Sequence, residues 1–260
     1  DVTHETEVDR MKSEFLTTAA HELRTPMVSV YGFTELLLNR PVPEARRRDV
    51  LETIHRQASL LINMVNELLD LARIEARQGK DMKRQRCRLG DLLDEAVHGL
   101  MVGGDERRVQ LHGGHADSRV QVDPEKLNRA LTNVLSNAFK YSPGGGAIVL
   151  RTLDGEVEGR PAVGVSVRDH GIGMTPAQQL RVFERFYRAD PSGNIPGTGL
   201  GMSLVKEIVE LHHGRVDLWS EAGVGTDVTL WLPLADEAGD ADADAGGADA
   251  AAALAGSDVA

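Results

Sequence analysis

The feature that most constrains this chain is a repeat over residues 15–38, FLTTAAHELRTPMVSVYGFTELLL. Its members are separated alternately by four and three residues, the spacing that lines one side of a helix packed lengthwise on another helix. They are Leu16, Ala20, Leu23, Met27, Val30, Thr34 and Leu37. The repeat predicts a long helix that needs a helical partner.

A second helix with the same periodicity is predicted over residues 44–76, after a break at residues 39–43 whose two prolines cannot continue a helix. The two helices should form an antiparallel hairpin. Its apolar face is too wide for one partner, so we expect two copies to pair into a dimeric four-helix bundle. A passive dimeric scaffold would show the same pattern, and the helices alone therefore predict association and not catalysis.

His21 lies one step off the predicted seam, so its imidazole should face water. Glu22 follows it directly, and Thr25 lies one turn further on the same face. Pro26 removes a backbone donor and should bend the helix just past the histidine. An ordinary surface histidine would fit this pattern equally well, so its role depends on the rest of the chain.

The net charge of −11 is concentrated at the end of the chain, where residues 235–260 contain seven acids and no Lys or Arg. The remainder is close to charge balance, which argues against nucleic-acid binding, since that requires a basic surface. One cysteine, no signal-peptide pattern and no long apolar run suggest a cytoplasmic chain, with membrane contact only through a segment upstream.

Beyond the hairpin, strands and helices alternate, which predicts an α/β sandwich with helices on one face. The acidic tail has too little apolar bulk to order itself. We predict a helical lead-in over residues 1–14, the hairpin over 15–76, a linker over 77–81, the α/β domain over 82–234 and a disordered tail over 235–260.

One face of a predicted helix in the α/β region could hold a metal and phosphates. Asn133, Asn137, Lys140 and Tyr141 recur at about four-residue steps along this helix. Neutral amide oxygens suit Mg²⁺ that keeps several waters, and a lysine suits phosphate oxygens. A solvated polar helix face would have the same spacing.

Two further segments contain glycines at positions where a nucleotide could approach the backbone. Asp169 with Gly171 and Gly173 follows an apolar strand, where a carboxylate can accept an adenine amino group and glycines admit the base. The last segment opens the final predicted helix, where backbone N–H groups and the helix dipole favour phosphate. It consists of Gly197, Thr198, Gly199, Leu200 and Gly201.

Between these two segments we expect a lid over residues 174–196. Aromatic residues at positions 183–187 should pack the root of this lid, and Arg188 should reach the γ-phosphate. The chain has no GxxxxGK[ST] or GxGxxG motif, so any ATP site must be of another kind.

The four segments, in this order, resemble the boxes of the Bergerat-type ATP-binding domain shared by histidine kinases and type II topoisomerases. The string HELRTP at residues 21–26 resembles the phosphoacceptor box of the sensor histidine kinases of two-component signalling. The resemblance covers about residues 12–234. The opening Asp-Val-Thr resembles the exit of a PAS sensor domain, which predicts such a domain upstream.

This resemblance implies a homodimer that uses ATP and Mg²⁺ to phosphorylate His21 and passes the phosphoryl group to a response regulator's receiver domain. It assigns the metal to Asn137 with Asn133, and the adenine to Asp169. Glu22 would hold Nδ1 of His21, and Thr25 would orient water to dephosphorylate the regulator.

Two alternatives stay open at the level of sequence. A catalytically silent dimeric scaffold could bind a response regulator without using ATP, and nucleotide affinity would distinguish it from a kinase. An ATPase clamp of the same superfamily would share the nucleotide site but has no use for an exposed HELRTP helix.

Overall fold

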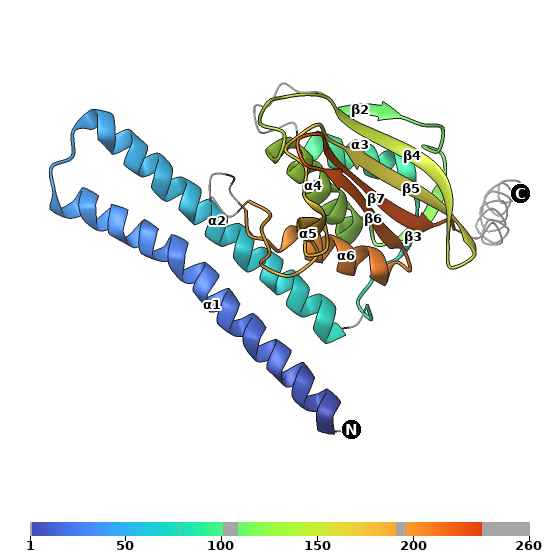
Figure 1. Cartoon of the computed structure of the whole chain (residues 1–260), viewed down its shortest axis with the longest axis horizontal. Helices are drawn as coiled ribbons and strands as arrows, with labels where there is room; N and C mark the ends of the chain where they lie inside the picture. Colours follow the sequence, from blue (N-terminus) through green and yellow to red (C-terminus); the bar gives the residue numbers. More distant parts are fainter. Residues whose placement is uncertain (1, 78, 101–108, 191–194, 196, 236–260) are drawn as a thin grey trace, which may run out of the picture.

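The computed structural model describes residues 2–77, 79–100, 109–190, 195 and 197–235, and the side chains from Phe15 onward except those of Glu75 and Arg77. The chain forms a long helical hairpin and an α/β unit, as predicted (Figure 1). Nearly all of the expected acidic tail lies outside the described residues.

The hairpin consists of α1 (Val2–Asn39) and α2 (Glu44–Arg77), which run side by side (Figure 1). α1 continues as one helix through Pro26, so the predicted bend does not interrupt it. Inside the hairpin the buried positions of α1 include Ala19 and Pro26. The intramolecular seam is therefore shifted by one position from the predicted one, because α2 contacts the neighbouring stripe of α1.

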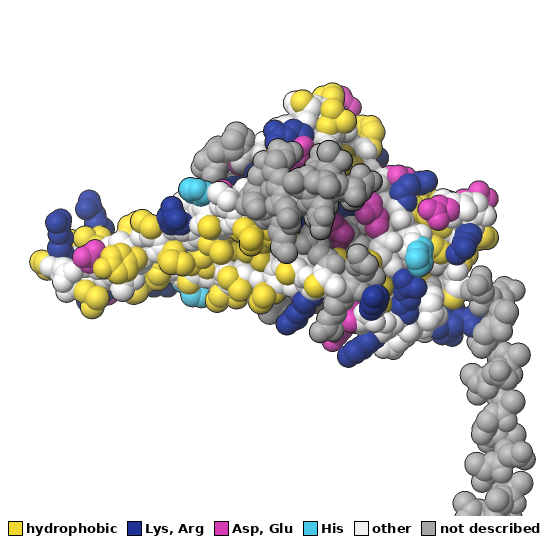
Figure 2. All heavy atoms as spheres, turned by 90° about the horizontal axis from the view of Figure 1, so that it is seen from below, with side chains coloured by type: hydrophobic (Ala, Val, Ile, Leu, Met, Phe, Trp, Pro, Cys, Tyr) yellow, Lys and Arg dark blue, Asp and Glu magenta, His cyan; other side chains and the backbone are white. Residues whose placement is uncertain are grey.

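The predicted seam instead contributes to an exposed apolar face of the hairpin. Leu16 is 59% exposed and Met27 is 57% exposed. Figure 2 shows hydrophobic side chains along the length of the hairpin on the face in view. The exposed large apolar side chains of the two helices are Leu16, Met27, Val28, Tyr31, Leu38, Leu51, Ile62, Val65 and Leu69. Such a long apolar face is typical of an interaction surface.

The α/β unit is built on a five-stranded sheet with strand order β2-β4-β5-β7-β6. β2 pairs parallel with β4, and the other neighbours are antiparallel. The elements are β1 (Gln85–Arg88), α3 (Leu89–Leu100), β2 (Val109–His112), β3 (Arg119–Val122), α4 (Pro124–Lys140), β4 (Ile148–Val157), β5 (Arg160–Arg168), α5 (Pro176–Gln179), α6 (Gly201–Leu211), β6 (Arg215–Glu221) and β7 (Gly225–Pro233). β1 and β3 form a separate two-stranded sheet.

The core lies between the sheet and the helices α3, α4 and α6, which cover one face (Figure 1). Alternation along β5 directs Val163, Val165 and Val167 into this layer. α4 begins at a capped turn, because the carboxylate of Asp123 accepts a hydrogen bond from the Lys126 N–H at 3.2 Å and Pro124 takes the first turn.

The same core extends onto α2 of the hairpin. Leu71 of α2 is fully buried and Ile74 is 7% exposed, and both belong to the apolar cluster of the α/β unit. Burying a side chain of this size contributes about 1.5–3 kcal/mol. The end of α2 is therefore held against the α/β unit, in line with its contacts to α6.

Candidate functional site

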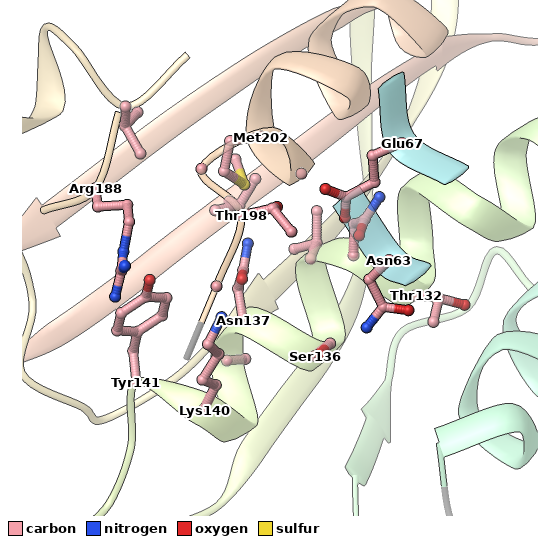
Figure 3. A pocket seen from close by; sticks show the side chains of 18 of the residues that line it. Asn63, Glu67, Thr132, Ser136, Asn137, Lys140, Tyr141, Arg188, Thr198 and Met202 are labelled. Atoms are coloured by element: carbon pink, nitrogen blue, oxygen red, sulfur yellow. The ribbon is translucent and has the colours of Figure 1, made fainter. Parts of the chain in front are cut away.

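A cavity of about 970 Å³ lies between α4, the start of α6, the segment before Ala189 and one side of α2 (Figure 3). Eleven of the predicted residues line it: Asn133, Asn137, Lys140, Tyr141, Asp169, Gly173, Arg188, Gly197, Thr198, Gly199 and Gly201. Gly171 and Leu200 belong to the same loops but are not part of the lining. Segments far apart in sequence thus meet at one hollow.

α4 supplies the polar floor of the cavity. Asn133, Asn137 and Lys140 are half-buried on one helix face, and Lys140 Nζ lies 5.4 Å from the centre of the Tyr141 ring. Burial lowers the pKa of Lys140, and the nearby positive charge of Arg188 lowers it further. A polyanionic ligand would relieve this repulsion, which makes this part of the cavity suited to phosphates.

Asp169 also lines the cavity, and one oxygen of its carboxylate makes three contacts. Oδ1 accepts hydrogen bonds from Gly171 N–H at 2.8 Å, Thr226 N–H at 3.3 Å and the Ser142 hydroxyl at 3.5 Å. Burial raises the pKa of Asp169, and these hydrogen bonds oppose the shift. Within the described residues Oδ2 takes none of these bonds, so it is placed to accept one from a ligand.

Apolar side chains line the same cavity as Asp169. Those that line the cavity include Val134, Val167, Met202, Leu218 and Val228. A flat, apolar ring with an exocyclic amino group matches an apolar wall beside a fixed carboxylate. The arrangement fits adenine.

The packing of the backbone requires glycine at positions 171 and 173, which was not predicted from the sequence. A Cβ at Gly171 would lie 2.0 Å from the carbonyl oxygen of Tyr141, and a Cβ at Gly173 would lie 1.9 Å from that of Glu221. Gly173 also has φ +61°. The chain's own backbone excludes side chains at both positions, which brings the loop against α4 and the β6–β7 turn. That these glycines also make room for the base stays a prediction.

The loop before α6 surrounds the end of the Lys140 side chain. A Cβ on Gly197 would lie 2.5 Å from Lys140 Nζ. Gly199 has φ +72° and lies against the backbone of Phe186, and Thr198 Oγ1 accepts a hydrogen bond from the Leu200 N–H at 3.2 Å. Backbone N–H groups at the start of the eleven-residue α6 and one ammonium thus point to the same region.

Arg188 brings a second cation to this region, as Figure 3 shows beside Tyr141. Its Nη2 donates a hydrogen bond to the Ile195 carbonyl at 2.7 Å. Its Nε is buried and has no partner among the described residues. A buried N–H without an acceptor is costly, so this donor is available for a ligand oxygen.

One wall of the cavity was not expected from sequence. Asn63, Glu67 and Asp70 of α2 belong to this wall, and Figure 3 shows the first two of them. Their spacing of three or four residues was the available signal, but such a polar stripe beside an apolar one is also the pattern of a solvent-facing helix side. Only the position of the α/β unit against α2 identifies it as part of a site.

His21 lies elsewhere. As predicted, it is exposed, and Thr25 Oγ1 donates a hydrogen bond to its carbonyl oxygen at 3.5 Å, while Glu22 is half-buried. None of the described residues of α1 lines the cavity. The structure therefore brings the predicted nucleotide residues together and keeps the histidine apart from them.

The donor set of the cavity fits a magnesium ion that is carried by phosphates. In the described part of the chain no three His, Cys, Asp or Glu side chains cluster as a metal site. Asn133 and Asn137 offer neutral oxygens, and Gly201 leaves space beside Asn133 Oδ1. Few protein ligands suit Mg²⁺, which retains waters and binds substrate phosphates. Across the described helices, none is both long and apolar enough to span a membrane.

Comparison with known proteins agrees with this geometry. The family described as "His Kinase A (phospho-acceptor) domain" matches residues 11–77, and "Histidine kinase-, DNA gyrase B-, and HSP90-like ATPase" matches residues 122–236. The chain is 33% identical over 255 residues to drug sensory protein A of Synechocystis sp., covering 90% of this chain and 36% of that protein.

Two further relatives give the same result. Alginate biosynthesis sensor protein KinB of Pseudomonas aeruginosa is 35% identical over 240 residues, covering 90% of this chain and 39% of that protein. The chain thus spans well under half the length of these curated relatives. The crystal structure of full-length ShkA in complex with AMPPNP has 26% identity and a TM-score of 0.58, covering 85% of this chain and 46% of that one.

Proposed function

Because this chain belongs to the sensor histidine kinases, we propose that it binds ATP in the cavity and transfers the γ-phosphoryl group to His21. From His21 the group would pass to an aspartate in the receiver domain of a response regulator. The observation that supports this most strongly is the meeting of Asp169, Asn137, Lys140 and the glycine loop at one hollow, in a chain that exposes His21 on a helix.

Each end of the cavity has a separate role in binding. Asp169 Oδ2 would accept the adenine amino group between apolar walls. Lys140, Arg188 and the N–H groups before α6 would hold the phosphates. Mg²⁺ bound to Asn137 with Asn133 would neutralise phosphate charge and orient the triphosphate.

The transfer itself needs little more than alignment. The lone pair of His21 Nε2 attacks the γ-phosphorus in line, an N–P bond forms, and the bond to the bridging oxygen breaks so that its electron pair leaves with ADP. Glu22 would accept the Nδ1 hydrogen bond, fixing the tautomer and stabilising the positive charge that develops on the ring.

The proposed function requires two partners, a second copy of the chain and a response regulator. The exposed apolar face of the hairpin would pair with a second copy to form the four-helix bundle. The response regulator would approach His21, where Thr25 would orient the water that hydrolyses the regulator's aspartyl phosphate. A silent scaffold is less well supported, because it has no use for the fixed carboxylate and the free arginine N–H in the cavity.

Labelling with γ-labelled ATP tests the proposal. The protein should acquire label that is labile in acid and stable in alkali, as a phosphoramidate is. His21→Ala should abolish labelling by removing the acceptor, and Asn137→Ala should abolish it by disabling the cavity. Label of the same chemistry on His21→Ala would assign the acceptor to another residue and overturn the proposal.

A further inference from the structure

The wall formed by α2 places a carboxylate at the phosphate end of the cavity. Glu67 lies beside Thr198 of the glycine loop (Figure 3), and its carboxylate accepts a hydrogen bond from the Thr198 hydroxyl. Glu67 is largely buried, and one of its oxygens, Oε2, has no hydrogen-bond partner among the described residues. A surface glutamate of a helical hairpin would not be expected in such a place.

One of the two positive charges around Glu67, that of Lys140, is also assigned to the nucleotide. Burial raises the pKa of Glu67, while the Thr198 hydrogen bond and the positive charges of Arg129 and Lys140 oppose the shift. Conversely, Glu67 is the carboxylate whose charge opposes the lowering of the Lys140 pKa. The side chain therefore serves as a counter-charge at the place where phosphate oxygens would lie.

An ion pair also holds the same helix to the α/β unit. Asp70, three residues after Glu67, pairs with Arg129 of α4. Both of these side chains are mostly buried and both line the cavity. Leu71 and Ile74 extend the contact into the apolar core.

α1 adds an aromatic contact at the root of the lid segment. The Phe15 and Phe186 rings lie 5.7 Å apart, and the Arg185 guanidinium lies 5.1 Å from the Phe15 ring. The α/β unit is thus docked on the hairpin through several independent contacts, with the cavity facing α2 and not His21.

We propose that Glu67 is an internal substitute for the nucleotide's phosphates, so that docking of the α/β unit on α2 and binding of a nucleoside triphosphate exclude each other. This inference rests on the proposed ATP site. Thr198 and Lys140 cannot serve a carboxylate and a triphosphate at once, and two like charges in a partly buried site repel. ATP binding then expels Glu67 and frees the unit to reach a histidine.

Because the coupling between docking and nucleotide binding is reciprocal, the proposal can be tested by measuring nucleotide affinity. If docking weakens nucleotide binding, nucleotide must weaken docking by the same factor. Removing the charge of Glu67 without changing its shape should therefore tighten nucleotide binding. If Glu67 instead helped to bind the nucleotide, the same substitution would weaken binding.

The test uses the whole 260-residue chain and the magnesium complex of AMPPNP, with affinities measured by calorimetry. Glu67→Gln should bind roughly five- to tenfold tighter than wild type, and Asp70→Asn roughly two- to fivefold tighter. Glu52→Gln is the matched control: it lies on the same helix, is exposed, pairs with Arg48 and does not line the cavity. It should stay within about twofold of wild type.

Small-angle scattering gives the second readout. AMPPNP should raise the radius of gyration of the wild type, and Glu67→Gln should be expanded already without ligand. The proposal is overturned if Glu67→Gln binds AMPPNP no more tightly than wild type, or if the radius of gyration of the wild type does not change when AMPPNP is added. Failure of the wild type and every variant to bind AMPPNP would instead show that the ATP site itself is wrongly assigned.

Discussion

At the scale of single residues, Asp169 separates a structural role from a binding role on its two oxygens. Oδ1 holds the loop through Gly171, Thr226 and Ser142, whereas Oδ2 takes none of these three hydrogen bonds. An asparagine can keep the first role, because its amide oxygen can replace Oδ1. It cannot keep the second, because an NH₂ group replaces the acceptor.

We therefore expect Asp169→Asn to fold normally but to bind ATP weakly. A hydrogen bond to a charged group is worth about 1.5–3 kcal/mol, which corresponds to a loss of roughly ten- to a hundredfold in affinity. Calorimetry with AMPPNP and a thermal melt measure the two effects. Asp227→Asn is the control, since Asp227 accepts the Ser166 hydroxyl at 2.7 Å and is not part of the cavity lining. Unimpaired binding by Asp169→Asn would contradict the assignment of adenine to this residue.

His212, at the end of α6, predicts how the α/β unit responds to pH. Its Nδ1–H donates a hydrogen bond to the Ile208 carbonyl at 2.7 Å, and its Nε2 accepts one from the Asp123 N–H at 2.8 Å. A second proton would break the latter bond. Burial lowers the pKa of His212; Arg84 and Lys126 act in the same direction, and the Ile208 hydrogen bond and Asp123 oppose them.

The sign follows from proton uptake. Below about pH 6.5 the unfolded chain protonates this histidine more readily than the folded chain does. The stabilisation it gives is complete above that pH and is lost as the pH falls towards the lower folded value. Between pH 7.5 and 5.5 the melting temperature should fall more steeply for wild type than for His212→Gln. The control His112→Gln, at an exposed position of β2, should show the same pH dependence as wild type. Parallel curves for wild type and His212→Gln would refute this.

At the scale of elements, the apolar pattern of the hairpin is accounted for only if the hairpin is part of a larger assembly. α1 and α2 bury one stripe between them and leave a second apolar stripe in water. The periodicity predicted two helices and a face too wide for one partner. It could not say which stripe α2 would take, because both are apolar and differ by a single position along α1.

We expect a charge on the exposed stripe to break the dimer without unfolding the helices. Ile62 is 61% exposed on α2 and lies outside the cavity. Ile62→Glu would bury a charge at the pairing surface and should raise the dissociation constant at least about tenfold, as sedimentation velocity would measure. Leu180→Glu, at a position 85% exposed on the α/β unit, should leave the dimer unchanged. Equal association of both variants would place the interface elsewhere.

The elements of the site differ in how far sequence could predict them. Helical periodicity predicts that Asn133, Asn137 and Lys140 share one helix face, and glycines mark the loop before α6. Their assignment to a nucleotide site came from the family resemblance. Glu67 and Asp70 could not be predicted, because their role depends on where α2 meets a domain far along the chain. The reason for Gly171 and Gly173 was also hidden, since it lies in the carbonyl oxygens of Tyr141 and Glu221, which contact them only in the folded chain.

At the scale of the whole molecule, the fold class followed from the order of elements, but the relation between the two halves did not. The cavity faces α2, and His21 stands on α1 outside it. A reaction between them requires the α/β unit to leave α2 or to serve a histidine of a second copy. The contacts of Glu67, Asp70 and Phe15 oppose that movement until nucleotide replaces the carboxylate.

The central claim is that this histidine receives a phosphoryl group from ATP held in that cavity. Mass spectrometry of peptides, prepared without acid after brief incubation with MgATP, tests it most directly. We predict the mass of one phosphoryl group on the peptide that contains His21, and none on that peptide from Asn137→Ala. A phosphoryl group found only on another residue, or found on His21 in the Asn137→Ala chain as readily as in wild type, would contradict the account.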